Sequence, residues 1–486
     1  MPKPKAGKAK FVSLTPTAGL ICQCCDPRLN VFTRRMNAAT SRRAVLCGGA
    51  ASLASAALPA RAQAGATKAV LFENVRVFDG TSDQLSPPSN VLVSGNIIRT
   101  ISTAPIPLPP GEDTRVIRGN GRTLMPGLID AHTHIMFETL SQVAILTGDI
   151  GFVNVAAVKA ANDMLMRGFT SIRDMGGPVF GLKRGIDAGI VPGPRIWPAG
   201  AFISQSGGHG DFRLPNDLPA RPGDYTYSER VGGAAIADSP DLVRLRAREQ
   251  LALGASQIKL MAGGGVASIY DPLDVTQYTV PELRAAVEAA ENWGTYAAVH
   301  AYTPRAVRQA LEAGVRCLEH GQLLDEPTAA LMAEKNIWWS LQPFLDDRPS
   351  PYPEGSSNRA KQLAMYRGTD TAYGLAAKYS IRTAWGTDTL FEPEIAAIRG
   401  WQLTKMTRWY SAAEVLRMGT SVNAELLALS GPRSPYTGTL GVVKEGALAD
   451  LLLAEGDPIA NIRLIEEPER NLKIVMKDGV IHKDAV

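Results

Sequence analysis

Eight short apolar segments, which alternate with helix-forming segments, dominate the middle of this 486-residue chain. The intervening segments carry helix boundaries. For example, Thr303-Pro304 is a typical N-terminus and Gly314 a typical C-terminal residue. Parallel strands require such helical crossovers, so the alternation predicts an α/β fold, a (β/α)8 TIM-type barrel over residues 126–436. The expected strands are Gly127–Ile129, Thr170–Ile172, Arg195–Pro198, Gln257–Met261, Tyr296–Val299, Cys317–Glu319, Ile337–Leu341 and Thr383–Trp385.

Both ends of the chain lack this alternation and have the pattern of β structure instead. Short runs rich in β-branched or apolar residues, such as Val70–Phe72, Val91–Val93 and Leu451–Leu453, are separated by turns that contain glycine and asparagine. We expect residues 65–125 and 437–486 to pair into one small β-sandwich domain.

The first 64 residues have the pattern of a twin-arginine signal peptide. Arg42-Arg43 precedes a weakly apolar stretch that is too short to span a membrane, and Ala62–Ala64 offers a small-residue cleavage site. A start at Met36 would give this leader a normal length. We therefore expect a periplasmic or secreted protein, or a cytoplasmic one if the leader is an artefact of the gene model.

The charge of the chain is unevenly distributed. Residues 1–64 contain ten Lys or Arg and one acid, so a net charge of +4 leaves the remainder mildly acidic. A nucleic-acid partner is therefore not expected, and neither is a membrane partner. Cys317 is the one cysteine outside this segment, which excludes an internal disulfide in the mature protein.

Most of the histidines fall where the expected strands end. Catalytic groups of such barrels lie at the C-terminal ends of the strands. The chain has six histidines, and four of them occupy these positions, with an aspartate in the matching place after the last strand. This pattern predicts a metal site, because imidazole and carboxylate are common ligands of divalent metals. The predicted ligands are His132, His134, His300, His320 and Asp388.

A lysine interrupts the otherwise apolar fourth strand. Lys259 lies within the segment Ser256–Met261, and an ammonium buried there is costly unless it is paired or deprotonated. A neutral lysine can take up carbon dioxide to form a carbamate, which could bridge two metals. We therefore add Lys259 to the predicted metal ligands. An ordinary ion pair with an acid is the alternative.

Three further features bear on a substrate. Arg173-Asp174 ends the second strand and predicts either an ion pair or a clamp in which Arg173 binds a substrate carboxylate. The long segments Asp211–Ser239 and Phe344–Arg359 follow the third and seventh strands. Loops of this length are often lids or substrate walls.

Two motifs resemble the amidohydrolase superfamily, and the resemblance runs from about Val70 to the end of the chain. Met125–His134 reads MPGLIDAHTH and is similar to the motif that opens the family's barrel, while Gly438–Asp450 is similar to its closing β-domain motif. The resemblance implies a two-metal site of the carboxylated-lysine type. Two Zn²⁺, or other divalent ions, would be bridged by carboxylated Lys259 and hydroxide, the first held by His132, His134 and Asp388, the second by His300 and His320.

Shorter sequence motifs resemble those of the imidazolonepropionase-like group, which contains Xaa-Pro dipeptidases, carboxypeptidases and ochratoxin-hydrolysing amidases. They are SGGHGD around His209, MAGGGV after Lys259, HAYT around Tyr302 and LEHG around His320. The resemblance implies that Asp388 moves the proton from the hydroxide to the leaving amine. It also implies that His209 and Tyr302 bind the oxyanion or the substrate carboxylate. A loop anchor and a packing residue are the alternative roles of these two.

The expected function is therefore metal-dependent hydrolysis of an amide or peptide bond in a dipeptide-like or N-acyl amino acid substrate, ochratoxin A among the candidates. A lactonase or other esterase, and an aminohydrolase that opens cyclic amides, remain alternatives on the same site. Deaminases of the superfamily usually have H-x-x-E on strand 5, whereas here Ala301-Tyr302-Thr303 follows His300. A non-enzymatic binding module would not need the complete set of predicted metal ligands, so this set argues against that alternative. The similarity to ring-shaped relatives implies a homo-oligomer, with an octamer favoured.

Overall fold

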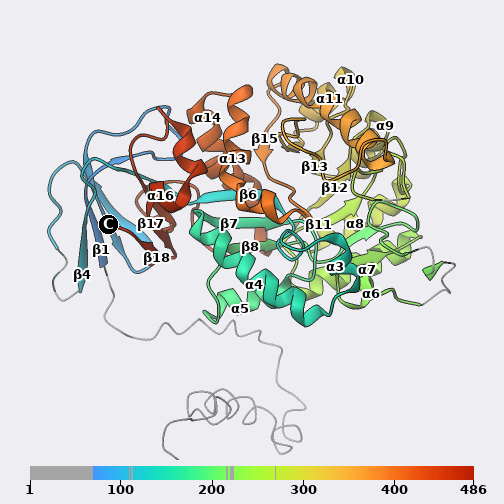
Figure 1. Ribbon diagram of the computed structural model, residues 1–486, viewed down its shortest axis with the longest axis horizontal. Helices are drawn as coiled ribbons and strands as arrows, with labels where there is room; N and C mark the ends of the chain where they lie inside the picture. Colours follow the sequence, from blue (N-terminus) through green and yellow to red (C-terminus); the bar gives the residue numbers. More distant parts are fainter. Residues whose placement is uncertain (1–68, 109, 111–112, 215–216, 219–223, 269) are drawn as a thin grey trace, which may run out of the picture. The chain divides into compact units, whose positions relative to one another are not determined.

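The computed structural model describes residues 69–108, 110, 113–214, 217–218, 224–268 and 270–486 (Figure 1). The predicted twin-arginine leader, residues 1–64, lies outside the described residues. Among the helices that are described, none is both long and apolar enough to cross a membrane.

The two ends of the chain form one β structure around a shared strand. The N-terminal half of β1 pairs with β2 and, in parallel, with β4, whereas its C-terminal half pairs with β5. A bulge between Phe72 and Val75, where Asn74 has φ 53°, bends β1 from one sheet into the other. The strands are β1 (Ala69–Val77), β2 (Ser89–Ser94), β3 (Ile97–Ser102), β4 (Thr114–Arg118), β5 (Thr123–Pro126), β16 (Leu451–Ala454), β17 (Leu472–Lys477) and β18 (Val480–Asp484).

The C-terminal strands complete this domain. β16 pairs antiparallel with β5 and with β17, and β17 pairs with β18. Buried side chains from both ends, among them Phe72, Val91, Leu453 and Ile474, form one apolar cluster. A β-sandwich is thus built from both chain ends, as predicted.

Eight parallel strands form the second part, and each coincides with an expected strand to within a few residues. They are β6 (Leu128–Thr133), β7 (Phe169–Asp174), β8 (Arg195–Pro198), β11 (Ile258–Met261), β12 (Ala297–Ala301), β13 (Cys317–His320), β14 (Trp338–Leu341) and β15 (Thr383–Trp385). Every pairing between them is parallel.

The third barrel strand is interrupted and then continues. After β8 the chain resumes as β9 (Phe202–Ser204), which pairs with β11 on one side and with β10 (Ala234–Ile236) on the other. The amide of Ser256 donates to the carbonyl of Pro198 at 2.7 Å and so joins β8 to the start of β11. The amide of Asp388, just after β15, donates to the carbonyl of His132 at 2.8 Å. The last strand is therefore tied to the first, and the predicted (β/α)8 barrel is confirmed.

Helices connect the strands, and the predicted boundaries hold. Thr303 precedes α9, which has Pro304 in its first turn and ends at Gly314 with φ 96°. A left-handed residue at this place suits glycine. The helices are α3 (Gln142–Thr147), α4 (Ile150–Met166), α5 (Phe180–Asp187), α6 (Tyr227–Arg230), α7 (Pro240–Leu253), α8 (Val280–Asn292), α9 (Pro304–Ala313), α10 (Glu326–Glu334), α11 (Ser357–Lys378), α12 (Pro393–Ala397), α13 (Arg399–Thr404), α14 (Ala412–Arg417), α15 (Asn423–Ala428) and α16 (Pro468–Asn471). Short 3-10 and π segments extend several of them, including η3 (Lys405–Arg408).

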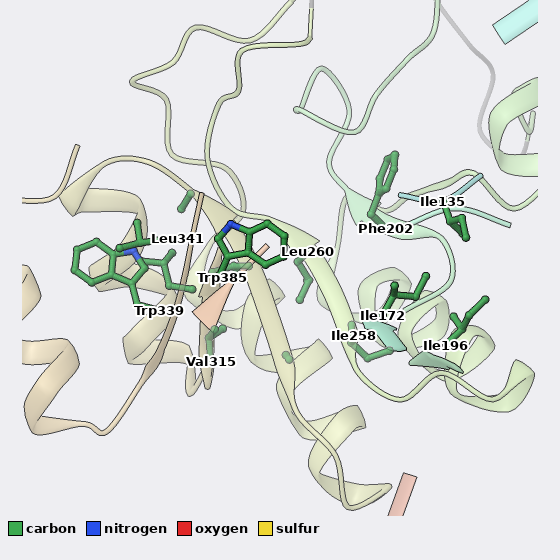
Figure 2. Close-up of a cluster of buried hydrophobic side chains, with 14 of the residues drawn as sticks. Ile135, Ile172, Ile196, Phe202, Ile258, Leu260, Val315, Trp339, Leu341 and Trp385 are labelled. Atoms are coloured by element: carbon green, nitrogen blue, oxygen red, sulfur yellow. The ribbon is translucent and has the colours of Figure 1, made fainter. Parts of the chain in front are cut away.

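The main core lies between the strands and the helices. Figure 2 shows part of it, with Ile172, Ile258, Leu260 and Leu341 among the labelled side chains. Successive strand residues point to opposite faces, so Lys259, between Ile258 and Leu260, points to the inside of the barrel. Alternation along the strands thus directs apolar residues to the helices and polar residues to the barrel interior.

Candidate metal centre

The six predicted metal ligands meet at the C-terminal ends of the barrel strands. His132 and His134 lie at the end of β6, Lys259 on β11, and the others on or just after β12, β13 and β15. Asp388 is the centre of the group, because its Oδ1 lies 3.2 Å from Nε2 of His132 and 3.3 Å from Nε2 of His134. One ligand atom each from His132, His320 and Asp388 lies within 4.8 Å of the others. Of the six side chains, that of Asp388 is the most exposed, at 15%.

Each of the four histidines has one ring nitrogen engaged by an oxygen. Nδ1 of His132 lies 2.8 Å from Glu319, and Nδ1 of His134 lies 2.9 Å from the carbonyl of Gly176. The remaining two contacts are His300 Nε2 to the Gly264 carbonyl, 3.1 Å, and His320 Nδ1 to Gln342 Oε1, 2.8 Å. A carbonyl oxygen only accepts, so the engaged nitrogen carries the proton and the other keeps its lone pair.

Burial keeps three of these rings neutral. It lowers the pKa of His134 and His300 below the ordinary value and lowers the pKa of His320 to about 3. A neutral imidazole with one nitrogen already bonded is the form that binds metal. The residues present therefore fit a divalent metal site with nitrogen and oxygen ligands.

Lys259 lies beside this group, and no carboxylate of the described residues forms an ion pair with it. Its Nζ is 3.5 Å from Nε2 of His132, and the side chain is buried. Burial lowers the pKa of Lys259 below its ordinary value, although the charges of Glu319 and Asp388 oppose the shift. A depressed pKa favours the neutral amine, which is the form that reacts with carbon dioxide.

Two of the ligands have unusual backbone conformations. His320 has φ 75° and Asp388 has φ 50°, in the left-handed region that costs energy for residues other than glycine. On β13 the alternation of side chains would direct Glu319 into the barrel and His320 away from it. The left-handed turn at His320 breaks this alternation and brings its ring to the other ligands.

A buried cluster ties the first strand to the loop that carries Asp388. One carboxylate oxygen of Asp130 accepts hydrogen bonds from the backbone amides of His132 and Thr387, at 3.1 and 3.0 Å. Its other oxygen accepts from the hydroxyl of Thr387 and forms an ion pair with Arg399, which also binds Glu138. The cluster thereby fixes the positions of His132 and Asp388 relative to each other.

Arg173 lies beneath the ligands rather than at a substrate surface, and this corrects the prediction that it binds substrate. Its guanidinium is fully buried and donates to both carboxylate oxygens of Glu319 at 2.8 Å. It also donates to the carbonyl of Ala131 and the hydroxyl of Tyr296. The alternative ion pair with Asp174 is wrong as well, because the anionic partner is Glu319.

The ion pair between Arg173 and Glu319 also affects the predicted metal ligand His132. Burial alone would raise the pKa of Glu319, but Arg173, His132 and Lys259 together hold that pKa well below its usual range. The resulting carboxylate accepts from Nδ1 of His132. Glu319 therefore orients His132 and fixes its tautomer, in the way that partners behind metal-bound histidines do.

The structure places His209 and Tyr302 beside the predicted metal ligands. The ring of His209 stacks on that of His300 with centroids 4.1 Å apart, and its Nδ1 lies 2.8 Å from the hydroxyl of Ser268. The ring of Tyr302 stacks on that of His320 at 5.2 Å. Burial raises the pKa of Tyr302 well above its ordinary value, so its hydroxyl keeps the proton. No other described residue forms a hydrogen bond with that hydroxyl.

A cavity of about 120 Å³ opens above the ligands. Three kinds of residue line it. At its base lie His134, Lys259, His300, His320 and Asp388, with His209 and Tyr302 beside them. Aromatic and apolar side chains form most of its walls, and Arg348 and Glu392 complete them. The arrangement gives a small chamber with the predicted metal ligands at one end.

Some residues of the site were not assigned from the sequence. Glu319 was visible as an acid inside an apolar strand, next to the ligand His320, and that position could have indicated its role. Gln342, Arg348, Glu392 and Arg399 come from segments without such a signal. Only the folded chain shows what they contact.

The chain matches known proteins over most of its length. A model of the amidohydrolase family matches residues 123–481. The curated ochratoxinase of Aspergillus niger is 30% identical over 381 residues, which cover 74% of this chain and 75% of that protein.

Solved structures of related proteins also match this chain over most of its length. A prolidase complexed with N-methylphosphonate-L-proline is 32% identical with a TM-score of 0.78, covering 86% of this chain and 100% of that one. A Xaa-Pro dipeptidase with bound methionine is 27% identical with a TM-score of 0.71, covering 85% and 100%. Like its relatives in the group of Xaa-Pro dipeptidases and ochratoxinase, this chain belongs to the amidohydrolase family.

Proposed function

We propose that this protein is a metal-dependent hydrolase that cleaves the amide or peptide bond of a dipeptide-like or N-acyl amino acid substrate. The observation that carries the proposal is the set of four histidines, each with one nitrogen already engaged, that meets Asp388 and Lys259 at the base of one cavity. The similarity to a prolidase, an ochratoxinase and a Xaa-Pro dipeptidase supports amide bonds as the target.

Two Zn²⁺, or another divalent metal, would fit the donor set. His132, His134 and Asp388 would hold one ion, His300 and His320 the other, and carboxylated Lys259 would lie between them. When bound, such ions lower the pKa of a coordinated water and polarise a substrate carbonyl.

The side chains supply the proton transfer. Oδ1 of Asp388 faces His132 and His134, which leaves Oδ2 to accept a proton from the attacking water and pass it to the leaving amine as the C–N bond breaks. His209 and Tyr302 line the cavity beside the ligands. They would donate hydrogen bonds to the carbonyl oxygen as it becomes negative, or to the substrate carboxylate.

The size of the cavity favours a small substrate. At about 120 Å³ it is smaller than the roughly 300–1,000 Å³ of pockets that hold drug-sized ligands. A dipeptide or a short N-acyl amino acid suits it better than ochratoxin A, which joins phenylalanine to a bulky aromatic acid.

A substrate screen tests this proposal. Purified, zinc-loaded protein is incubated with N-acyl amino acids, Xaa-Pro dipeptides and ochratoxin A, and the release of free amino acid is measured. We expect the small amides to be cleaved, with activity lost after chelation and restored by zinc. Asp388→Asn is the inactive control. No release of amino acid from any of these amides, or activity that survives removal of the metal, would contradict the proposal.

His209 offers a second test through its neighbour Gly265. A β-carbon at Gly265 would overlap the imidazole of His209, so Gly265→Ala is expected to displace that ring. We expect kcat/KM to fall about 100-fold, a typical cost of misplacing a catalytic group by about an ångström, with zinc content unchanged. Gly374→Ala is the matched control, because a β-carbon there meets no atom within 4 Å. Equal activity in both variants would exclude a catalytic role for His209.

Two expectations from the sequence stay predictions. One is export to the periplasm or the medium through the twin-arginine route. The other is assembly into a homo-oligomer, with an octamer favoured. Light scattering on the purified protein measures the second directly.

A further inference from the structure

The loop that follows β11 folds back on itself beside His209. Gly263 forms an antiparallel bridge with Thr276, which closes the loop at its base. A β-carbon at Gly265 would overlap Cε1 of His209. The backbone of the loop therefore packs directly against the imidazole, and the position of the loop limits where that ring can lie.

Asp271 lies inside this loop and is almost fully buried, with 3% of the residue exposed. Its Oδ2 accepts from the amide of Gly265 at 2.8 Å and from Nε2 of Gln277 at 3.2 Å. Gln277 in turn accepts, through Oε1, from the backbone amide of His209 at 3.0 Å. One carboxyl oxygen thus holds both the residue that packs against the ring of His209 and the residue that binds its backbone.

The ring of His209 is held from the same loop. Its Nδ1 lies 2.8 Å from the hydroxyl of Ser268 and 3.7 Å from Oδ2 of Asp271. Among the described residues, none forms a hydrogen bond with its other nitrogen, Nε2. Since His209 lines the cavity above the metal ligands, Nε2 remains for a group of the substrate.

Helix α11 fixes the loop on another side. Nζ of Lys361 donates to the carbonyls of Ser268 and Asp271 at 2.8 and 3.1 Å. Nδ2 of Asn358 donates to the carbonyls of Val266 and Ser268 at 2.6 and 3.0 Å. All four contacts reach the backbone of the loop, so the loop is supported without the carboxyl group of Asp271.

That carboxyl group is costly for the fold. Oδ1 of Asp271 is buried and has no hydrogen-bond partner among the described residues. A buried polar atom without a partner lowers stability. Because α11 already fixes the loop, support of the fold alone does not account for an acid at this position. The contacts of the other oxygen, Oδ2, lead to His209.

We propose, on the basis of the amide hydrolysis proposed above, that Asp271 is a positioning residue that acts through His209. Through Gly265 and Gln277 it fixes the backbone around the ring, and Ser268 sets the orientation of the ring itself. His209 then faces the carbonyl oxygen on which charge develops, without rearrangement when the substrate binds. Asp271 is not among the described residues that line the cavity, so it does not touch the substrate.

The first test replaces Asp271 in the zinc-loaded protein. The substrate is N-acetyl-L-leucine or L-leucyl-L-proline, whichever the wild type hydrolyses faster. Asp271→Leu removes both oxygens, and we expect kcat to fall about 100-fold, a typical cost of misplacing a catalytic group by about an ångström. KM should change little, because the lost contact is made in the transition state. Asp271→Asn keeps one oxygen that can accept from Gly265 and Gln277, so it should restore most of the rate.

The same substitution in a His209→Ala variant separates positioning from support of the loop. If Asp271 acts through His209, Asp271→Leu should change the rate of His209→Ala by no more than about twofold, because the effects of coupled residues do not add. Lys361→Met is the matched control. It loosens the same loop through backbone carbonyls, so its effect should be equal with and without His209. A loss of about 100-fold from Asp271→Leu in both backgrounds would overturn the inference.

Crystal structures of the zinc-loaded wild type and Asp271→Leu keep the test independent of turnover. We expect the ring of His209 to leave its stacked position on His300, while the metal ligands stay in place. An unmoved ring would overturn the inference, whatever the rates show. No hydrolysis of any amide by the wild type would instead count against the proposed function, and the two structures would still decide whether Asp271 positions His209.

A second variant covers the case in which Asp271→Leu does not fold. Gln277→Leu cuts the connection between Asp271 and the backbone of His209 and leaves the bond to Gly265 in place. We expect a loss of about 10-fold in kcat, the contribution of one hydrogen bond, and no loss in the His209→Ala background. An equal loss in both backgrounds would mean that Gln277 and Asp271 only support the loop.

Discussion

Replacing Lys259 by methionine is expected to abolish activity without weakening the fold. The proposed carbamate would help to hold both metals, so its loss should lower the zinc content from two ions per chain to one or fewer. We expect kcat/KM to fall by at least about 1,000-fold, since a metal ion contributes several kcal/mol to such a reaction. The metal-free variant should unfold at the same temperature as the wild type or higher, because a buried amine surrounded by apolar strand residues is removed.

A loss of activity and zinc without a loss of thermal stability distinguishes a metal ligand from a lysine that only supports the fold. Lys361 provides the control, because it is also buried but donates to the carbonyls of Ser268 and Asp271. Lys361→Met is expected to lower the unfolding temperature and to leave two zinc ions bound. Elemental analysis and thermal unfolding of the two variants measure the contrast. Full activity of Lys259→Met would rule out the two-metal centre.

Replacing Glu319 by leucine is expected to have the largest effect on stability. The change leaves the guanidinium of Arg173 buried without its anion, and breaking such a pair costs about 3–5 kcal/mol. His132 loses its oxygen partner at the same time. Zinc affinity should therefore fall by about 10- to 100-fold, the usual cost of losing a partner behind a metal ligand. Thermal unfolding of the metal-free protein and competition with a zinc chelator measure the two effects.

The double variant Arg173→Met/Glu319→Leu distinguishes the two roles of Glu319. It removes both charges, so most of the lost stability should return. Zinc affinity should remain low, because His132 still lacks its acceptor. Equal stability of the double and single variants would mean that the buried charge on Arg173 is not the source of the cost.

The strands and the candidate metal ligands could be predicted because their signals are local. A strand such as β8 is a short apolar run between turns, and α9 begins and ends with the residues that favour those positions. Once eight such units are recognised, the geometry of a parallel barrel places every strand end on one rim. Four histidines and Asp388 at these ends are sufficient to indicate a metal.

Arg173 shows where local reasoning fails. It ends β7 beside Asp174, and both an ion pair and a substrate clamp were compatible with that position. Its partner, Glu319, lies 146 residues further along the chain, four strands away around the barrel. No periodicity or spacing relates two residues that the closed barrel brings together across its interior.

By itself the sequence determined the fold class, the order of the elements and the set of candidate metal ligands, because these depend on residues that are neighbours along one strand or one helix. The tertiary structure alone decided which nitrogen of each histidine is free, that Arg173 supports His132 through Glu319, and that Arg348 faces the cavity. These features depend on contacts between segments far apart in the chain. Their free energies are settled by burial and by partners that exist only after the barrel has closed.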